Sequence, residues 1–170
     1  MLLETALMCM AANIYHEAGN QSMIGQMAVG QVVLNRVEDT RFPDTVCEVV
    51  KQAVTYKGTN KPVLHKCQFS WYCDGKKDEP DMDSRTWRFA LEHASILLTK
   101  TIVLDITEGA THYHATYVRP AWAKTKTRTT RIDRHIFYRG EKEYDRTIVR
   151  IRSISICRTE QRVYTSGQAE

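Results

Sequence analysis

The feature that most constrains the fold is a pair of helical patterns near the N-terminus. Apolar residues recur at helical spacing over residues 3–18, and a second apolar pattern covers residues 23–37. We expect Gly19 to end the first helix in a left-handed conformation and Ser22 to cap the second. Because the second helix is apolar on nearly every side, it is predicted to be buried at the centre of the domain.

Further helices and a group of strands follow. Helices are predicted over residues 44–55, with Asp44 as the cap, and over residues 85–98. Residues 66–84 between them are rich in loop signals. The segments with the partial alternation of strands are 111–118, 131–139 and 146–156. Since the sequence has no repeat or linker, we predict one α+β domain over residues 1–170, a helical body with a small antiparallel sheet.

Composition excludes several classes of protein. The 170 residues are 42% hydrophobic and 26% charged, and no apolar run approaches the roughly 20 residues that span a bilayer. The N-terminus lacks a basic leader and does not resemble a signal peptide. A protein that acts outside the cytoplasm would therefore need another route of export, or a leader that has been trimmed.

The positive charge is concentrated in one segment, residues 124–134. It is either a solvated strand edge or a surface that meets an anionic envelope polymer. The residues proposed for that contact are Lys124, Lys126, Arg128 and Arg131. No nucleic-acid-binding module accompanies them, so no nucleic-acid partner is predicted.

The five cysteines do not form a recognisable site. Cys67 and Cys73 lack the C-x-x-C spacing of zinc or thioredoxin-type motifs. Cys9 lies in an apolar helical pattern and is interpreted as a small core residue. A disulfide among Cys47, Cys67 and Cys73 is compatible with an oxidising compartment, and the sequence does not select the pair.

Glu17 is the best single candidate for chemistry. It lies at the negative end of the first helix dipole, which disfavours a charged carboxylate. Burial, the helix end and the lack of an adjacent Lys or Arg are each expected to raise its pKa. A carboxyl group that keeps its proton is what a general acid needs to protonate a glycosidic oxygen. Alternatively, Glu17 is simply solvated.

Other catalytic motifs fail or stay open. Asn20 stands where an H-E-x-x-H zinc motif needs its second histidine. His112 and His114 share one strand face and could chelate a metal with His135 or His16, or could hydrogen-bond in a polar cleft. No nucleophile elbow, phosphate-binding loop or dinucleotide fingerprint is present.

Four segments in one order resemble the SleB-type cell-wall hydrolases, the spore-cortex-lytic enzyme family. They are MAANIYHEAGNQSMIGQMAVGQVVLNRV at 10–37, CQFSWYCDGK at 67–76, GATHYHATYVRPAW at 109–122 and IDRHIFYR at 132–139. The resemblance covers about residues 6–139, and residues 140–170 are interpreted as an additional strand and tail.

This resemblance implies a lysozyme-like fold and cleavage of peptidoglycan glycan strands between N-acetylmuramic acid and N-acetylglucosamine. Members are characteristically lytic transglycosylases that leave 1,6-anhydromuramic ends, and their catalytic glutamate matches Glu17. A hydrolase usually needs a second carboxylate about 5 to 9 Å away. Asp74 is a candidate, although Asp-Gly is first a turn signal, and Glu108 is expected to be exposed. A hydrolytic muramidase therefore remains an alternative.

Substrate contacts are expected around Glu17. One cleft wall would contain Phe69, Ser70 and Tyr72, together with Trp71. The opposite wall would contain His112, Tyr113, His114 and Tyr117, with His135 and Trp122 as weaker candidates. Packing in the core or sheet is the alternative for all of them. No metal or cofactor is predicted, and a monomer is expected.

Two functions of other classes compete with glycan cleavage. A zinc-dependent N-acetylmuramoyl amidase would use His112, His114 and His135 as ligands. A non-catalytic envelope-binding module would use the basic segment and the aromatic residues. A compact, mildly basic domain without a leader suits a bacteriophage endolysin, and a bacterial enzyme with a trimmed leader is the rival origin.

Overall fold

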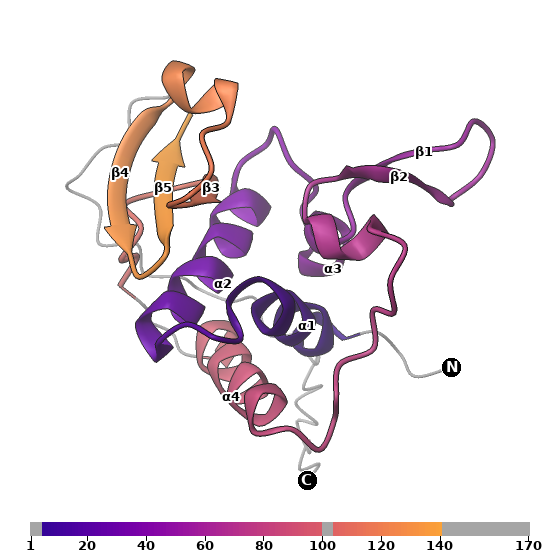
Figure 1. Cartoon of the computed structure of the whole chain (residues 1–170), viewed down its shortest axis with the longest axis horizontal. Helices are drawn as coiled ribbons and strands as arrows, with labels where there is room; N and C mark the ends of the chain where they lie inside the picture. The colour runs from indigo at the N-terminus through magenta and orange to yellow at the C-terminus, as the bar shows by residue number, and fades with distance from the viewer. Residues whose placement is uncertain (1–4, 100–103, 141–170) are drawn as a thin grey trace, which may run out of the picture.

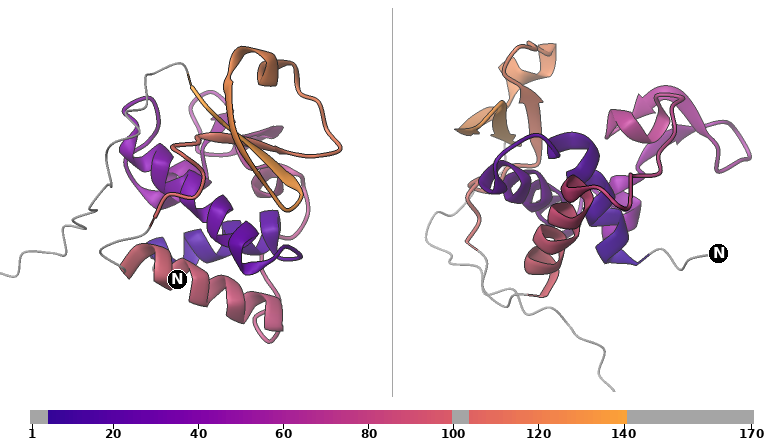
Figure 2. Two further views of the ribbon diagram at one scale, coloured as in Figure 1. Left: turned by 90° about the vertical axis from the view of Figure 1, so that its left-hand side faces the viewer. Right: turned by 60° about the horizontal axis from the view of Figure 1, so that its bottom comes forward.

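The computed structural model describes residues 5–99 and 104–140. Two small sheets stand on either side of a helical body (Figures 1 and 2). The body consists of α1 (Ala6–Ala18), α2 (Met23–Glu38), α3 (Val46–Val50) and α4 (Arg85–Thr99). This arrangement confirms the predicted α+β class. The predicted strand at 146–156 and the rest of the predicted tail lie outside the described residues.

Helix α2 is at the centre of the fold, as its apolar pattern predicts. It packs against α1, α3, α4 and strand β4. Val29, Val32 and Val33 have no exposed surface. Gln26 is also buried, and its Oε1 accepts a 2.7 Å hydrogen bond from His93 Nδ1 of α4.

The sheets are antiparallel. Strands β1 (Ala53–Thr55) and β2 (Pro62–Cys67) form a hairpin. The three-stranded sheet has the order β3-β5-β4, so that, among the described residues, β5 is central and β4 is an edge. Its strands are β3 (His112–Ala115), β4 (Thr127–Ile132) and β5 (His135–Arg139). Two 3₁₀ helices complete the structure, η1 (Ser70–Cys73) and η2 (Ala121–Thr125).

The start of α2 is fastened to the turn between β4 and β5. Ser22 caps the helix by accepting a bond from Gly25 N, as predicted. The Ser22 backbone N and Oγ also donate to Asp133 Oδ2, at 2.9 and 2.6 Å. A side chain at position 25 would meet the same carboxylate at 2.4 Å, so glycine allows the turn to approach.

Three local predictions are wrong. Gly19 is right-handed (φ −58°), and glycine is needed there because a Cβ would lie 2.5 Å from the Tyr15 carbonyl oxygen. The helix predicted at 44–55 spans only Val46–Val50, because residues 53–55 pair with β2 instead. Its cap is Thr45, whose side chain accepts from Glu48 N, and not Asp44.

Two disulfides connect the described residues. Cys9 of α1 is buried, as predicted, but it is bonded to Cys47 of α3. Cys67 is bonded to Cys73, which closes the loop that contains η1. No helix in the described ranges is long and apolar enough to cross a membrane.

Candidate active site

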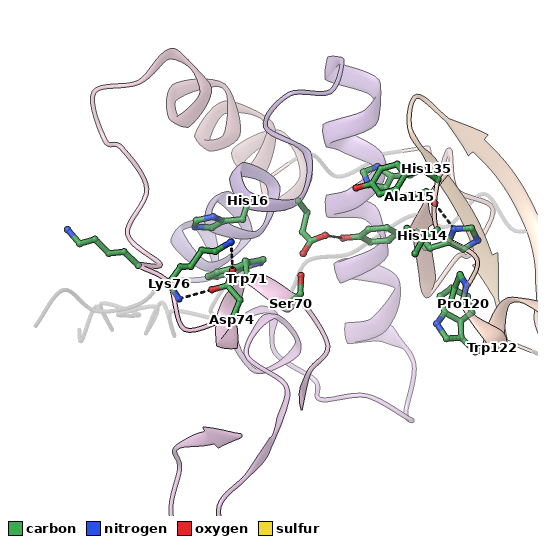
Figure 3. Close-up of a pocket in the computed structure, with 15 residues that line it drawn as sticks. His16, Ser70, Trp71, Asp74, Lys76, His114, Ala115, Pro120, Trp122 and His135 are labelled. Atoms are coloured by element: carbon green, nitrogen blue, oxygen red, sulfur yellow. Dashed lines mark hydrogen bonds and ion pairs between the residues drawn. The ribbon is translucent and has the colours of Figure 1, made fainter. Parts of the chain in front are cut away.

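A cleft of about 620 Å³ separates the η1 region from the three-stranded sheet. In Figure 3, His16, Trp71, Asp74 and Lys76 lie on one side, and His114, Pro120 and Trp122 lie on the other. The lining is His16, Glu17, Ser70, Trp71, Asp74, Lys76, Lys77, Tyr113, His114, Ala115, Tyr117, Val118, Pro120, Trp122 and His135. The cleft therefore combines aromatic faces with a few polar groups, as binding sites for sugars do.

Glu17 enters this cleft from the last turn of α1. Its Oε2 accepts a 3.0 Å hydrogen bond from the Tyr113 hydroxyl. Burial raises the pKa of the Glu17 carboxyl, while the Tyr113 bond and the charge of Arg36 oppose that rise. The predicted direction of the pKa shift is thus confirmed. No Lys or Arg is adjacent to Glu17 in the sequence, but the charge of Arg36, from α2, acts on its carboxyl.

Arg36 is a buried cation whose charge acts on the Glu17 carboxyl, with 4% of its surface exposed. Its Nε donates to the Thr111 carbonyl at 2.8 Å, and its guanidinium lies 5.1 Å from the Phe42 ring centre and 5.0 Å from that of Phe69. The sequence contained a signal for this residue, a charged side chain in a helix predicted to be buried.

Asn35 fixes the turn that precedes β3. Its Nδ2 donates to Asp105 Oδ2, Thr107 Oγ1 and the Ala110 carbonyl, at 3.1, 3.2 and 2.9 Å. Asp105 also accepts from Gly109 N at 2.7 Å. Consecutive contacts from Asn35 and Arg36 thereby set where β3 starts, and β3 places Tyr113 against Glu17.

The η1 wall is attached to α1. The Trp71 ring stacks on His16, with ring centres 4.5 Å apart, and its Nε1 donates to Asn13 Oδ1 at 3.1 Å. His16 Nε2 in turn donates to the Asp78 carbonyl at 3.0 Å. These contacts hold an indole beside Glu17, where a sugar ring can stack.

The opposite wall is formed by the sheet and η2. His114 stacks on Tyr138 at 5.3 Å and meets Trp122 edge-on at 5.7 Å. His135 is 7% exposed and contacts the Tyr113 ring at 5.0 Å. Tyr117 lines the cleft with 86% of its surface exposed, so its ring is available to a ligand.

The structure brings Ser70, Tyr113, His114 and His135 to the cleft with Glu17, but it does not bring three other predicted residues there. Those three are Phe69, Tyr72 and His112. Phe69 is 2% exposed because its ring packs under Arg36. Trp71, not Tyr72, faces the cleft from η1.

His112 packs between Phe42 and Trp122, with ring centres 6.1 and 5.5 Å away. Burial, followed by the charges of Lys126, Arg36 and Arg41, lowers the pKa of His112 to about 4. His112 is therefore an uncharged packing residue next to the cleft at neutral pH.

Glu17 and Asp74 are the carboxyl residues of the cleft lining within the described ranges. Asp74 Oδ1 accepts from Lys76 N at 2.8 Å, and Oδ2 lies 3.5 Å from Lys76 Nζ. The backbone bond from Lys76 is the main reason why the Asp74 pKa is lowered. Glu108 is exposed, as expected, and lies in a turn with positive φ (56°).

No group of three or more His, Cys, Asp or Glu side chains in residues 5–99 and 104–140 is arranged to hold a metal. His114 Nδ1 donates to the Ala115 carbonyl at 2.8 Å and its Nε2 lies 3.0 Å from the Tyr138 hydroxyl, so both ring nitrogens have protein partners. The three histidines of the amidase alternative thus do not form a ligand cluster.

Comparison with solved structures supports the predicted fold. The catalytic domain of the germination-specific lytic transglycosylase SleB from Bacillus anthracis matches with 24% identity and a TM-score of 0.56, over 82% of this chain and 99% of that one. The catalytic domain of Bacillus cereus SleB matches with 24% identity and a TM-score of 0.54, over 79% and 89%. These likenesses show a SleB-like, lysozyme-like fold, and neither supports a bacteriophage origin.

The sequence itself matches the cell wall hydrolase family over residues 20–138, a range that starts just after Glu17. Comparison with curated proteins found no significant match. The family match covers well over half of the sequence, which establishes the family. Because the matched range does not include Glu17, this assignment does not depend on the candidate acid. The chain belongs to the cell wall hydrolase family.

Proposed function

We propose that the protein is a lytic transglycosylase that cleaves peptidoglycan between N-acetylmuramic acid and N-acetylglucosamine, with Glu17 as its acid and base. The observation that carries this proposal is the Glu17 carboxyl, which burial helps to keep protonated in a cleft lined by aromatic rings. Membership of the cell wall hydrolase family supports the substrate class. We take residues 1–170 as one catalytic domain that acts at the cell wall.

The reaction needs one carboxyl group in two protonation states. Glu17 donates its proton to the glycosidic oxygen as the bond from that oxygen to C1 of the muramic acid breaks. The resulting carboxylate accepts the proton of the muramic 6-hydroxyl while the 6-oxygen bonds to C1. A 1,6-anhydro ring forms, no water is consumed, and Glu17 regains its proton.

The cleft walls suit this substrate. Trp71 and Trp122 offer apolar ring faces from opposite sides, on which pyranose rings stack. Ser70 and His135 supply polar atoms for hydroxyl and acetamido groups, and His114, whose ring nitrogens bond to Ala115 and Tyr138, lines the cleft beside them. We expect these residues, with Tyr113, to position the two sugars that flank the scissile bond.

A hydrolytic muramidase is the second candidate, and Asp74 is the observation that favours it. Asp74 lines the same cleft with a lowered pKa, so it is ionised at neutral pH and could activate a water. Its oxygens, however, already accept from Lys76 N and lie near Lys76 Nζ. We therefore assign Asp74 to the turn and Glu17 alone to the chemistry.

Product analysis tests the proposal. Purified peptidoglycan is digested, and the fragments are weighed by mass spectrometry before and after borohydride reduction. We expect muramic ends that lack the mass of one water and resist reduction. Reducible ends of hydrolytic mass would establish the muramidase, and released peptides with intact glycan strands would establish the amidase. The Glu17→Gln variant in the same digest is the control for contaminating activity.

A further inference from the structure

Arg36 is the buried charged group whose role the reaction above does not use. With 4% of its surface exposed, it does not reach a substrate in the cleft. Its Nη1 is buried and has no hydrogen-bond partner among the described residues. An unpaired cation in a protein interior is costly, and an apolar side chain of similar volume would pack there at less cost. Packing alone therefore does not account for the guanidinium.

The position of Arg36 relative to the acid supplies an explanation. Arg36 Nε binds the Thr111 carbonyl at 2.8 Å, and Tyr113, two residues further along, donates to Glu17 at 3.0 Å. Helices α1 and α2 pack together, and Arg36 does not line the cleft into which Glu17 points. Arg36 and Tyr113 are the groups whose charge and hydrogen bond act on Glu17. The other ionisable side chains of the lining are His16, Asp74, Lys76, Lys77, His114 and His135.

We propose that Arg36 is the counter-charge of the Glu17 carboxylate, a positioning residue that stabilises Glu17 during the interval between its two proton transfers. In that interval Glu17 carries a full negative charge in surroundings that otherwise penalise it. A fixed cation that is buried outside the cleft lining lowers that penalty without occupying the space that the substrate needs. The inference rests on the proposed acid–base role of Glu17.

The rings on either side of Arg36 fit this role. Phe42 and Phe69 hold the guanidinium within about 5 Å of their centres, which restricts its motion and excludes water. A cation shielded in this way acts on its neighbour more strongly than one in solvent. Phe69 thus contributes to the site from behind Arg36 and not as a sugar platform.

The test measures the Glu17 titration directly and through the pH–rate profile. In Arg36→Gln, the loss of the cation raises the pKa of Glu17 further. Since kcat/KM requires protonated Glu17, its alkaline limb moves to higher pH by the same amount. A weaker acid also donates its proton more slowly, so kcat falls by about tenfold or more. Arg36→Lys, which keeps the charge, leaves the limb near its wild-type position.

The titration is followed by ¹³C NMR of the Glu17 carboxyl carbon, which does not depend on catalysis. Arg41→Gln is the matched control, because Arg41 also lies over Phe42, at 5.9 Å, but is bonded to Asp39. It should leave the Glu17 titration unchanged. A folded Arg36→Gln protein with an unmoved carboxyl titration would overturn the inference.

If Arg36→Gln does not fold, the Arg36 guanidinium can be observed in the wild-type protein instead. The ¹⁵N signals of the Arg36 guanidinium should shift as pH passes through the Glu17 titration, and should stay constant in Glu17→Gln. Guanidinium signals that do not follow Glu17 contradict the inference. Cleavage of peptidoglycan by Glu17→Gln would instead refute the proposed function. In that case the Glu17 titrations in wild type and Arg36→Gln would still show whether Arg36 acts on Glu17.

Discussion

Glu17 and Asp74 belong to one cleft but meet opposite surroundings. Glu17 lies in the last turn of α1, accepts a bond from Tyr113 and has a raised pKa because its carboxyl is largely removed from solvent. Asp74 ends η1, accepts a backbone bond from Lys76 and has a lowered pKa. The two environments shift the two pKa values in opposite directions, so Glu17, and not Asp74, is the carboxyl group favoured to hold a proton.

The difference shows what the fold does for each residue. Glu17 is held by elements far apart in sequence, α1, α2 and β3, whose packing sets its protonation. Asp74 is held by its own loop and needs no distant residue for its contacts with Lys76. Catalytic sites are typically built from elements that are distant in sequence. An Asp carboxylate that accepts a bond from the backbone N–H two residues later is typical of a turn.

The largest expected effect is at Glu17. Glu17→Gln keeps the shape and the acceptor for Tyr113 but has no proton to donate, so lysis should fall by about 10²- to 10⁴-fold. Turbidity loss of a peptidoglycan suspension measures it. A variant that clears the suspension as fast as wild type would remove Glu17 from the mechanism and favour the envelope-binding module.

The same variant should not be less stable. Because the folded-state pKa of Glu17 is raised above the ordinary value of 4.5, ionisation of wild type costs stability as pH rises through that range. Gln avoids this cost, so at pH 7 Glu17→Gln should unfold at the wild-type temperature or above it. Below pH 4.5 the advantage should vanish, since both side chains are then neutral. A lower unfolding temperature at pH 7 would show that the activity loss includes misfolding.

Tyr113 is expected to have the next largest effect. Tyr113→Phe removes the hydroxyl bond that lowers the Glu17 pKa, so the alkaline limb of kcat/KM should move to higher pH. Activity at pH 7 should fall by about tenfold, the usual loss for a hydrogen bond to a charged group. Tyr56→Phe, at a half-exposed tyrosine near the β1–β2 turn, is the control and should change neither quantity. A pH limb that stays in place would mean that Tyr113 only packs the sheet.

Asp74 should matter much less than Glu17. Asn at this position still accepts from Lys76 N, and an ion pair exposed to solvent contributes little, so Asp74→Asn should lose no more than about fivefold in activity. Initial rates of muropeptide release measure this loss. A loss comparable to that of Glu17→Gln, with reducible ends, would replace the single-acid mechanism by a two-carboxylate hydrolase.

The parts of the molecule that sequence predicts are those with local causes. The burial of α2 follows from its own pattern, and the Ser22 cap from its own side chain. The choice of Glu17 as the candidate acid follows from its position at a helix end and from the segment around it. In contrast, the apolar pattern of α3 continues into β1, so the local sequence predicts one helix over both. Residues 53–55 form a strand only because they pair with β2.

The features of the site that the sequence does not predict depend on partners far away in the chain. Nothing near Arg36 in the sequence specifies Thr111 or Phe69, so its place beside Glu17 follows only from the packing of α1, α2 and β3. The aromatic run from Phe69 to Tyr72 likewise gives no sign of which ring is buried. The 3₁₀ geometry of η1 turns Trp71 to the cleft and leaves Phe69 in the core.

The smallest expected effect comes from the positive charge beyond the cleft. Lys124, Arg128 and Arg131 are exposed, and β4 has one neighbouring strand among the described residues, so these charges can meet an anionic wall polymer. Lys126 is partly exposed beside them. If they attract the enzyme to the wall, lysis should weaken as ionic strength rises through about 0.15 M, where the screening length is about 8 Å.

Replacing all four basic residues with Gln should flatten this salt dependence and lower the low-salt rate of wall lysis by a few fold at most. A matched variant removes four exposed charges elsewhere, at Lys57, Lys61, Lys66 and Arg88, and should keep the wild-type salt profile. The readout is the lysis rate of whole walls across salt concentrations, compared with cleavage of a small soluble muropeptide, which has no polymer to attract. Identical salt profiles for the two variants would show that the basic segment is only a solvated strand edge. A flattened profile in the variant of the basic segment alone would show that attraction to the wall is separate from the chemistry at Glu17.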